Sequence, residues 1–220
     1  LKKLWMAPAT LTLALGLAAC GSTVTENEDT NDAPKTETSD LSGTLSFYTS
    51  QPETDATKLV AEFNKLYPEV DVEIFRSGTE EVIGKIMAEK TAGDVQADVL
   101  LVADEVTFEN LKNQDLLAEY ESPEFEHIPE QYIDEDNMYA GTKTMSTVIA
   151  YNTDLVSEAP TSWLDLTDAK TKDQTIMPSP LYSGAAAYNL GIFTRTASLG
   201  WDFYENLKAN GVTVGQGNGS

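Results

Sequence analysis

Hydrophobic and polar residues recur with two different periods from residue 44 onward, and the periods alternate along the chain. Alternation of apolar and polar residues over 44–49 and 70–75 is typical of strands, and the nearly continuous apolar run 97–102 is typical of a strand covered on both faces. After each of these runs, apolar residues recur every three or four positions, which predicts a helix. This order of elements predicts a mostly parallel, doubly wound α/β sheet.

Short polar residues predict where the helices of this first part begin. Thr54 or Asp55 is expected to cap the first helix, and Ser77-Gly78-Thr79-Glu80 fits a capping box for the second. The second part of the chain continues the alternation. Its predicted elements are strands over 139–147, 148–151, 174–177 and 212–214, and helices that begin at Ser162, Ser183 and Gly200.

The stretch around Ser183 is the most informative in the chain. A predicted strand runs into a turn rich in proline, and a helix begins at Ser183, where the following residues Gly184 and Ala185 favour a compact first turn. The first amides of a helix have no partner within it, and their dipoles favour an anion. The sequence therefore indicates a loop that holds a phosphate, phosphonate or carboxylate, with an ordinary capped helix as the structural alternative.

Ligands of a parallel sheet bind beyond the carboxyl ends of its strands. The residues directly after the three predicted strands of the first part are Ser50, Gln51, Ser77, Gly78 and Asp104. A polar residue at each strand end predicts a polar cleft. Each also has a structural alternative, because Ser50 and Ser77 can cap or turn and Asp104 can cap the helix that follows it.

The N-terminus resembles a bacterial lipoprotein signal. Two lysines precede a short apolar run, and Leu17-Ala18-Ala19-Cys20-Gly21 resembles a lipobox, which implies cleavage before Cys20 and acylation of its thiol. A plain secretory signal with a chance cysteine is the alternative. Residues 1–20 are therefore expected to be a signal peptide and residues 21–43 a disordered acidic tether. The folded part would be lipid-anchored at the outer face of the cytoplasmic membrane.

The charge of the chain limits its partners. The net charge is −22, and from residue 44 onward 30 acidic residues face 11 basic ones. This balance excludes nucleic acid and electrostatic adsorption to anionic membranes, and it means that an anion site must supply its own donors. Cys20 is the one cysteine and His127 the one histidine, and no nucleophile motif is present. A secreted hydrolase that uses paired carboxylates is kept as a distant alternative.

Several short marks, in their order and spacing, resemble one family. They are L-S-F-Y-T-S-Q at 45–51, S-G at 77–78, A-D-V-L at 97–100, V-I-A-Y-N-T at 148–153, W-L-D-L at 163–166, S-P-L-Y-S-G-A-A at 179–186, L-G-W at 199–201 and the terminal G-N-G-S. The chain is thereby similar to extracellular solute-binding proteins of ABC importers, in the group that takes ferric iron, thiamine, polyamines and organophosphates. That likeness implies a two-lobe, type 2 periplasmic-binding-protein fold, with a first lobe over 44–147.

The same likeness implies a hinge crossing and a partial second lobe over 148–220, followed by further chain. It implies that Ser183, Gly184 and Ala185 hold an anion and that Asn218 lies in the matching asparagine position. The ligand would be an organic anion, or Fe³⁺ with a synergistic anion, and it would pass to an ABC permease.

The likeness implies no resident cofactor and no enzymatic activity, and it leaves the metal ligands unknown. Pro52 and Ala103 stand where iron binders often have a histidine and a glutamate, which places iron below an organic anion. A cationic ligand such as thiamine or a polyamine is the next candidate, because the chain is acidic. An adhesin or sensor subunit built on the same fold is a further alternative.

Overall fold

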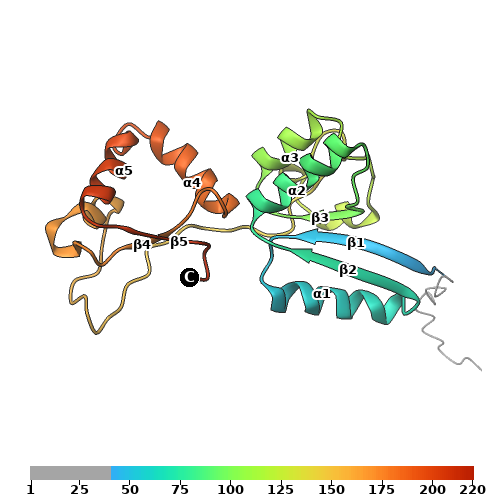
Figure 1. Cartoon of the computed structure of the whole chain (residues 1–220), viewed down its shortest axis with the longest axis horizontal. Helices are drawn as coiled ribbons and strands as arrows, with labels where there is room; N and C mark the ends of the chain where they lie inside the picture. The colour runs from blue at the N-terminus through green and yellow to red at the C-terminus, as the bar shows by residue number, and fades with distance from the viewer. Residues whose placement is uncertain (1–40) are drawn as a thin grey trace, which may run out of the picture. The chain divides into compact units, whose positions relative to one another are not determined.

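The computed structural model describes residues 41–220. These residues form two sheets, each made of parallel strands, as Figure 1 shows. We call the part built on the three-stranded sheet the first lobe and the part built on the two-stranded sheet the second lobe. The predicted signal peptide 1–20 with Cys20, and nearly all of the predicted tether 21–43, lie outside the described residues.

The first lobe is a doubly wound α/β layer structure. Its elements are β1 (Gly43–Thr49), α1 (Glu53–Leu66), β2 (Val70–Arg76), α2 (Thr79–Ala92), β3 (Val99–Leu101) and α3 (Glu105–Lys112). The strands are parallel in the order β2-β1-β3. In Figure 1, α1 covers one face of the sheet, and α2 and α3 cover the other. The predicted parallel, doubly wound sheet is confirmed.

The core of the first lobe follows from the alternation in β1. Neighbouring residues point to opposite faces, so Phe47 and Tyr48 are both buried, and Tyr48 packs against Val82 and Ile86 of α2 and Leu111 of α3. At 25 cal/mol per Å² of buried apolar area, each such side chain contributes about 1.5–3 kcal/mol. This core fixes the strand ends from which the candidate site begins.

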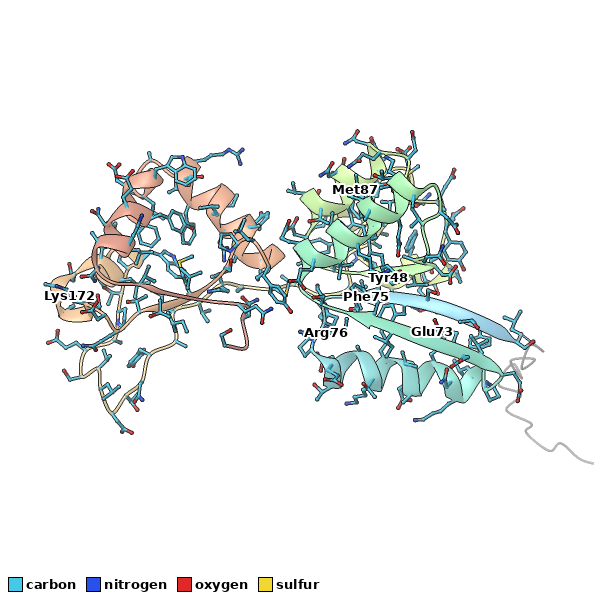
Figure 2. All side chains as sticks on the ribbon, viewed as in Figure 1. Tyr48, Glu73, Phe75, Arg76, Met87 and Lys172 are labelled. Carbon is cyan, nitrogen blue, oxygen red and sulfur yellow. The ribbon has the colours of Figure 1, made fainter. Side chains whose placement is uncertain are left out.

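A polar group lies at the edge of this core. Figure 2 shows Tyr48 and Phe75 on neighbouring strands, with ring centroids 5.1 Å apart. The ammonium of Lys85 lies over both rings, and the Tyr48 hydroxyl donates to Glu89 at 2.7 Å. Burial and the Glu89 carboxylate raise the pKa of Tyr48, although the hydrogen bond with Lys85 opposes them. These contacts hold α2 against the sheet.

The second lobe has much less sheet. Its described elements are η3 (Trp163–Thr167), η4 (Ala169–Thr171), β4 (Ile176–Pro178), α4 (Gly184–Arg195), α5 (Gly200–Ala209) and β5 (Thr213–Gly215), with η1 (Pro123–His127) and η2 (Glu130–Tyr132) in the connection before them. β4 and β5 are parallel and pair over three residues each. Phe203 and Leu207 of α5 are buried, and Phe203 packs edge-on against Phe193 of α4.

Two predicted helix caps are wrong. α1 begins at Glu53, and its cap position is Pro52, with no side-chain hydrogen bond to the helix start. α2 begins after Gly78 and also has no side-chain cap, because the Ser77 hydroxyl donates to the carboxylate of Glu81 instead. Serine forms such local bonds readily, and here the bond competes with the capping box.

The predicted strands over 139–151 are also wrong. Apart from an isolated bridge between Ile133 and Ala140, this segment pairs with no strand among the described residues. An apolar, extended segment becomes a strand only when a neighbour pairs with its backbone groups. Here the chain passes from the first lobe toward the second, and the hydroxyl of Thr147 donates to Asn189 of α4 at 3.0 Å.

The connection after α3 is fixed by a buried ion pair. Asp134, which is 8% exposed, accepts from Lys112 at 2.6 Å and from the amides of Asp136 and Met138. Burial raises the pKa of Asp134, but the bonds from Lys112 and these amides outweigh burial and lower the pKa.

Within residues 41–220 no helix has the length and apolar character needed to cross a membrane.

Candidate functional site

The start of α4 places Ser183 as sequence reasoning predicted. Ser183 has extended backbone and its hydroxyl accepts from the Ala186 amide at 3.3 Å, so it caps the helix. The same hydroxyl donates to the Asn218 side-chain oxygen at 3.2 Å, which joins the last turn of the chain to the helix start. Among the described residues, the amides of Gly184 and Ala185 have no hydrogen-bond acceptor.

The first lobe meets this helix start at Thr79, a residue that sequence reasoning missed. Thr79 is 2% exposed and donates to the Ser50 hydroxyl at 3.1 Å, while its own oxygen accepts from the Ala103 amide at 3.4 Å. A Cβ added to Gly184 would lie 2.9 Å from the Thr79 hydroxyl oxygen. The predicted capping box at residues 77–80 treated Thr79 only as part of the helix start. The hydrogen bond between Thr79 and Ser50 joins residues far apart in the sequence, so their spacing could not predict it.

Five of the predicted site residues therefore lie along one line of contacts. Ser50 contacts Thr79, and Thr79 packs on Gly184. Gly78 packs on Tyr182, and Ser183, the next residue, bonds Asn218. The members that the sequence predicted are Ser50, Gly78, Ser183, Gly184 and Asn218, with Ala185 following in the first turn of α4. We call this group, with Thr79 and Tyr182, the junction site.

The other predicted residues lie beside the junction site with different partners. Gln51 accepts from Arg76 through its backbone oxygen at 3.0 Å and from Lys143 through its side chain at 2.6 Å. Lys143 also lies 3.6 Å from the carboxylate of Asp55. Sequence reasoning missed both cations, although the position of Arg76 as the last residue of β2 was a usable signal. Two positive charges thus gather next to Ser50 in a strongly acidic chain.

Asp104 has the structural role that was its alternative. Its carboxylate caps α3 by accepting from the Thr107 amide at 3.0 Å. Burial, and after it the charge of Asp104, raise the pKa of Glu80 in the first turn of α2. The two carboxylates therefore interact and form a negative group near the first turn of α2.

A cavity of about 710 Å³ lies elsewhere in the first lobe, between β3, α3 and the segment 131–145. Its lining is largely apolar, with Val99, Leu101 and Phe108 among its residues. Asp104 and Lys143 reach it, whereas Ser50, Ser183 and Asn218 do not line it. A charged solute gains little from such a lining, so we place the candidate site at the junction site. No cluster of three metal-ligating side chains is found within residues 41–220.

Comparisons with known proteins agree on one family. The family model described as bacterial extracellular solute-binding protein matches residues 58–218. A probable ABC transporter periplasmic-binding protein, y4fP of Sinorhizobium fredii, is 26% identical over 151 residues, which are 64% of this chain and 42% of that protein.

Solved structures show the same fold. AfuA from Actinobacillus pleuropneumoniae, with exogenous fructose-6-phosphate bound, superposes with a TM-score of 0.65 at 24% identity, over 79% of this chain and 57% of that one. Iron-bound HitA from Pseudomonas aeruginosa superposes with a TM-score of 0.63 at 21% identity, over 80% and 56%. The chain therefore spans about half the length of the proteins that it matches.

Proposed function

Because the chain belongs to the bacterial extracellular solute-binding proteins, whose members bind solutes and are not enzymes, we propose that it is the receptor of an ABC importer. It captures a small solute between its lobes and delivers that solute to a permease. Lobe closure over the ligand converts binding into a shape that the permease recognises. No catalytic role is assigned to any residue.

The solute, in this proposal, carries an anionic group that binds at the start of α4. The observation that carries the proposal is the pair of amides of Gly184 and Ala185, which have no acceptor among the described residues and lie beside the hydroxyl of Ser183. The positive end of the α4 dipole adds to them. Arg76 and Lys143 supply positive charge nearby, which offsets the acidity of the chain as a whole.

The chemical class is a phosphonate, a sugar phosphate or a similar organic anion. Fe³⁺ held with a synergistic anion is a second form of the same proposal, because the anion would use the same amides. The similar structures that were solved with fructose-6-phosphate and with iron fit both forms. Pro52 and Ala103, which depart from the iron-binding pattern, favour the organic anion.

A cationic solute such as thiamine or a polyamine is the second candidate, and one observation favours it. Glu80 and Asp104 repel one another, which contributes to the raised pKa of Glu80. A cation between them would relieve that repulsion. The two candidates thus use different groups: the amides at the start of α4 for an anion, and the carboxylates of Glu80 and Asp104 for a cation.

Isothermal titration of the chain separates the candidates. The probes are fructose-6-phosphate, fructose, methylphosphonate, ferric citrate, thiamine and spermidine. We expect heat with a phosphoryl compound and none with fructose, and we expect Ser183→Ala and Arg76→Gln each to weaken binding by about tenfold, the loss of one charge-assisted hydrogen bond. Arg195→Gln, at the opposite end of α4, is the matched control and should bind as the wild type does.

Equal binding of fructose and its phosphate would contradict the anionic proposal. Binding of spermidine or thiamine that is lost in Glu80→Gln would replace it with the cationic one.

We also propose that the protein is held outside the cytoplasmic membrane by a lipid on Cys20. The lipobox-like sequence around Cys20 supports this. Detergent-phase partitioning of the expressed protein should be lost in Cys20→Ser and kept in a serine-to-alanine change at Ser22. A Cys20→Ser protein that still partitions with detergent would contradict the anchor.

A further inference from the structure

The turn before α4 supplies a cap to a helix of the other lobe. α2 has no side-chain cap at Gly78, so its first amides lack the usual partner. The amide of Glu80 donates to the backbone oxygen of Tyr182 at 3.3 Å. A carbonyl of the second lobe therefore satisfies an orphan amide of the first lobe.

The ring of Tyr182 lies close to two glycines from distant parts of the chain. A Cβ on Gly78 would overlap the Tyr182 carbonyl oxygen and lie 2.7 Å from two atoms of the ring. A Cβ on Gly217 would lie 3.1 Å from Cε1 and 3.2 Å from Cδ1 of the same ring. Gly78 has φ −67° and ψ 156°, which any residue adopts, so the glycine is required for space and not for backbone conformation.

A second close approach lies next to the first. Gly184, the first residue of α4, packs so closely on Thr79 that a Cβ would lie 2.9 Å from both its Cβ and its hydroxyl oxygen. The two lobes thus meet twice, and each meeting pairs a glycine of one lobe with a side chain of the other. Asn218 follows Gly217 directly and bonds Ser183, so the ring of Tyr182 also supports the turn that carries Asn218.

We propose that Tyr182 is a positioning residue of the junction site, and that Gly78 and Gly184 form with it and Thr79 a latch that holds the two lobes in contact. The carbonyl of Tyr182 caps α2, and its ring holds the Asn218 turn beside Ser183. The latch keeps the free amides of α4 next to Ser50 and Thr79. This inference rests on the proposed function as a solute receptor, but it predicts a distance between the lobes that can be measured without a ligand.

The chain offers a matched control for each latch glycine. Gly84 lies within α2, as Gly78 lies at its start, and a Cβ there meets nothing within 4 Å. Gly191 lies within α4, and a Cβ there would meet only the end of the Arg195 side chain, at 3.6 Å. Alanine at either control position should leave the lobes as they are. It should also stabilise its helix slightly.

The test measures the distance between the lobes directly. Spin labels are placed on cysteines at Glu73 in β2 and Lys172 after η4, two exposed positions marked in Figure 2, in a Cys20→Ser background. Gly78→Ala and Gly184→Ala should shift the distance distribution measured by electron double resonance away from that of the parent protein. Gly84→Ala and Gly191→Ala should reproduce the parent distribution. All four variants should keep the far-ultraviolet circular dichroism of the parent.

A second comparison tests Tyr182 itself. A Cβ at position 217 meets only the Tyr182 ring, so the overlap in Gly217→Ala should disappear when Tyr182→Ala is added. The double variant should therefore have the same distance distribution as Tyr182→Ala alone. Alanine at Gly78 also meets the backbone oxygen, so Tyr182→Ala should not restore Gly78→Ala. Tyr182→Phe, which keeps the ring and the carbonyl, should match the parent in both distance and ligand affinity.

The outcomes of these tests are separable from those of the proposed function. Gly78→Ala and Gly184→Ala with the distance distribution of their controls would overturn the latch, whatever the protein binds. A shifted distribution in a protein that binds none of the probes would support the latch and count against the proposed solutes. Where the parent binds a phosphoryl compound, the latch predicts an affinity at least tenfold weaker in Gly78→Ala and unchanged in Gly84→Ala.

Discussion

The two lobes hold the same site by different means. In the first lobe, three paired strands and a core of Tyr48, Val82, Ile86 and Leu111 fix the strand ends. In the second lobe, two strands of three residues each and the buried side chains of α5 carry the start of α4. Ile176 and Val214 of that small sheet are 57% and 55% exposed.

This difference shows which contacts fix the positions of the junction-site residues. A sheet with helices on both faces positions Ser50 and Thr79 through the core of the first lobe, and the second lobe adds to this only the Tyr182 carbonyl and the contact of Gly184. Ser183 and Asn218 depend on a cap, a hydrogen bond and the contacts of Tyr182 with the first lobe. Perturbing the first lobe should therefore cost global stability, and perturbing the second should cost local geometry.

The largest expected effect is a cavity in the first core. Leu111 is 2% exposed, and Leu111→Ala should lower the free energy of unfolding by about 3 kcal/mol. Urea unfolding should be followed by far-ultraviolet circular dichroism, and by tryptophan fluorescence in a Trp5→Phe background, where Trp163 and Trp201 report on the second lobe. If the lobes are held differently, the fluorescence transition should move less than the dichroism transition. Equal shifts of both would contradict the comparison.

The buried ion pair behind the first lobe should come next. Asp134→Asn removes a carboxylate that accepts from Lys112 and two amides, which should cost about 2 kcal/mol. The pKa of Asp134 is lowered in the folded protein, so its contribution is present above its ordinary pKa and is lost as the pH falls through the lowered value. The urea midpoint of the wild type should therefore fall in acid more steeply than that of Asp134→Asn.

The exposed pair of Lys170 and Asp168, 4.0 Å apart, is the control for that experiment. Asp168→Asn should leave the midpoint and its pH dependence unchanged, because solvent screens such a pair. An acid dependence as steep in Asp134→Asn as in the wild type would show that other carboxylates dominate.

A smaller effect separates the two helix starts. Ser183 caps α4, so Ser183→Ala should cost about 1 kcal/mol. Ser77 precedes α2 but does not cap it, so Ser77→Ala should cost only a few tenths of a kcal/mol, the value of an exposed local bond. Chemical denaturation of both variants measures the contrast. A larger loss of stability in Ser77→Ala than in Ser183→Ala would contradict the structure and support the predicted capping box at Ser77.

The smallest effect concerns the carboxylates beside the junction site. Burial and then Asp104 raise the pKa of Glu80, so the folded protein binds that proton more tightly than the unfolded chain. The destabilisation of the folded protein by ionised Glu80 is absent below the ordinary pKa of the group and grows as the pH rises through the raised pKa. Glu80→Gln should therefore stabilise the protein at neutral pH by about 0.5 kcal/mol or less, given solvent screening. Glu69→Gln, in an exposed turn, is the control. An equal gain of stability in Glu69→Gln would show that the effect comes from the net charge of the chain and not from the contact of Glu80 with Asp104.

Sequence patterns carried the architecture of the first lobe because local and tertiary preferences agree there. The alternation of apolar and polar residues predicted β1 and β2, and Ser183 caps α4 as predicted. The strands expected over 139–151 failed because periodicity reports which face is apolar and not whether a neighbour is present to pair.

The candidate site was predictable only in part, for a related reason. The position of Ser183 at a helix start and of Ser50 at a strand end is local information. The roles of Thr79 and Tyr182 arise from contacts between segments about 100 residues apart in sequence, which no local pattern encodes. The cations Arg76 and Lys143 meet at Gln51 for the same reason.

The most direct test of the central claim observes the two free amides themselves. In a nitrogen–proton correlation spectrum, titration with fructose-6-phosphate should shift the amide resonances of Gly184 and Ala185 downfield, because each gains a charged acceptor. Fructose should leave them in place. If the phosphate shifts residues that line the cavity beside β3, such as Val99 and Leu101, while these two amides stay unchanged, the account is contradicted.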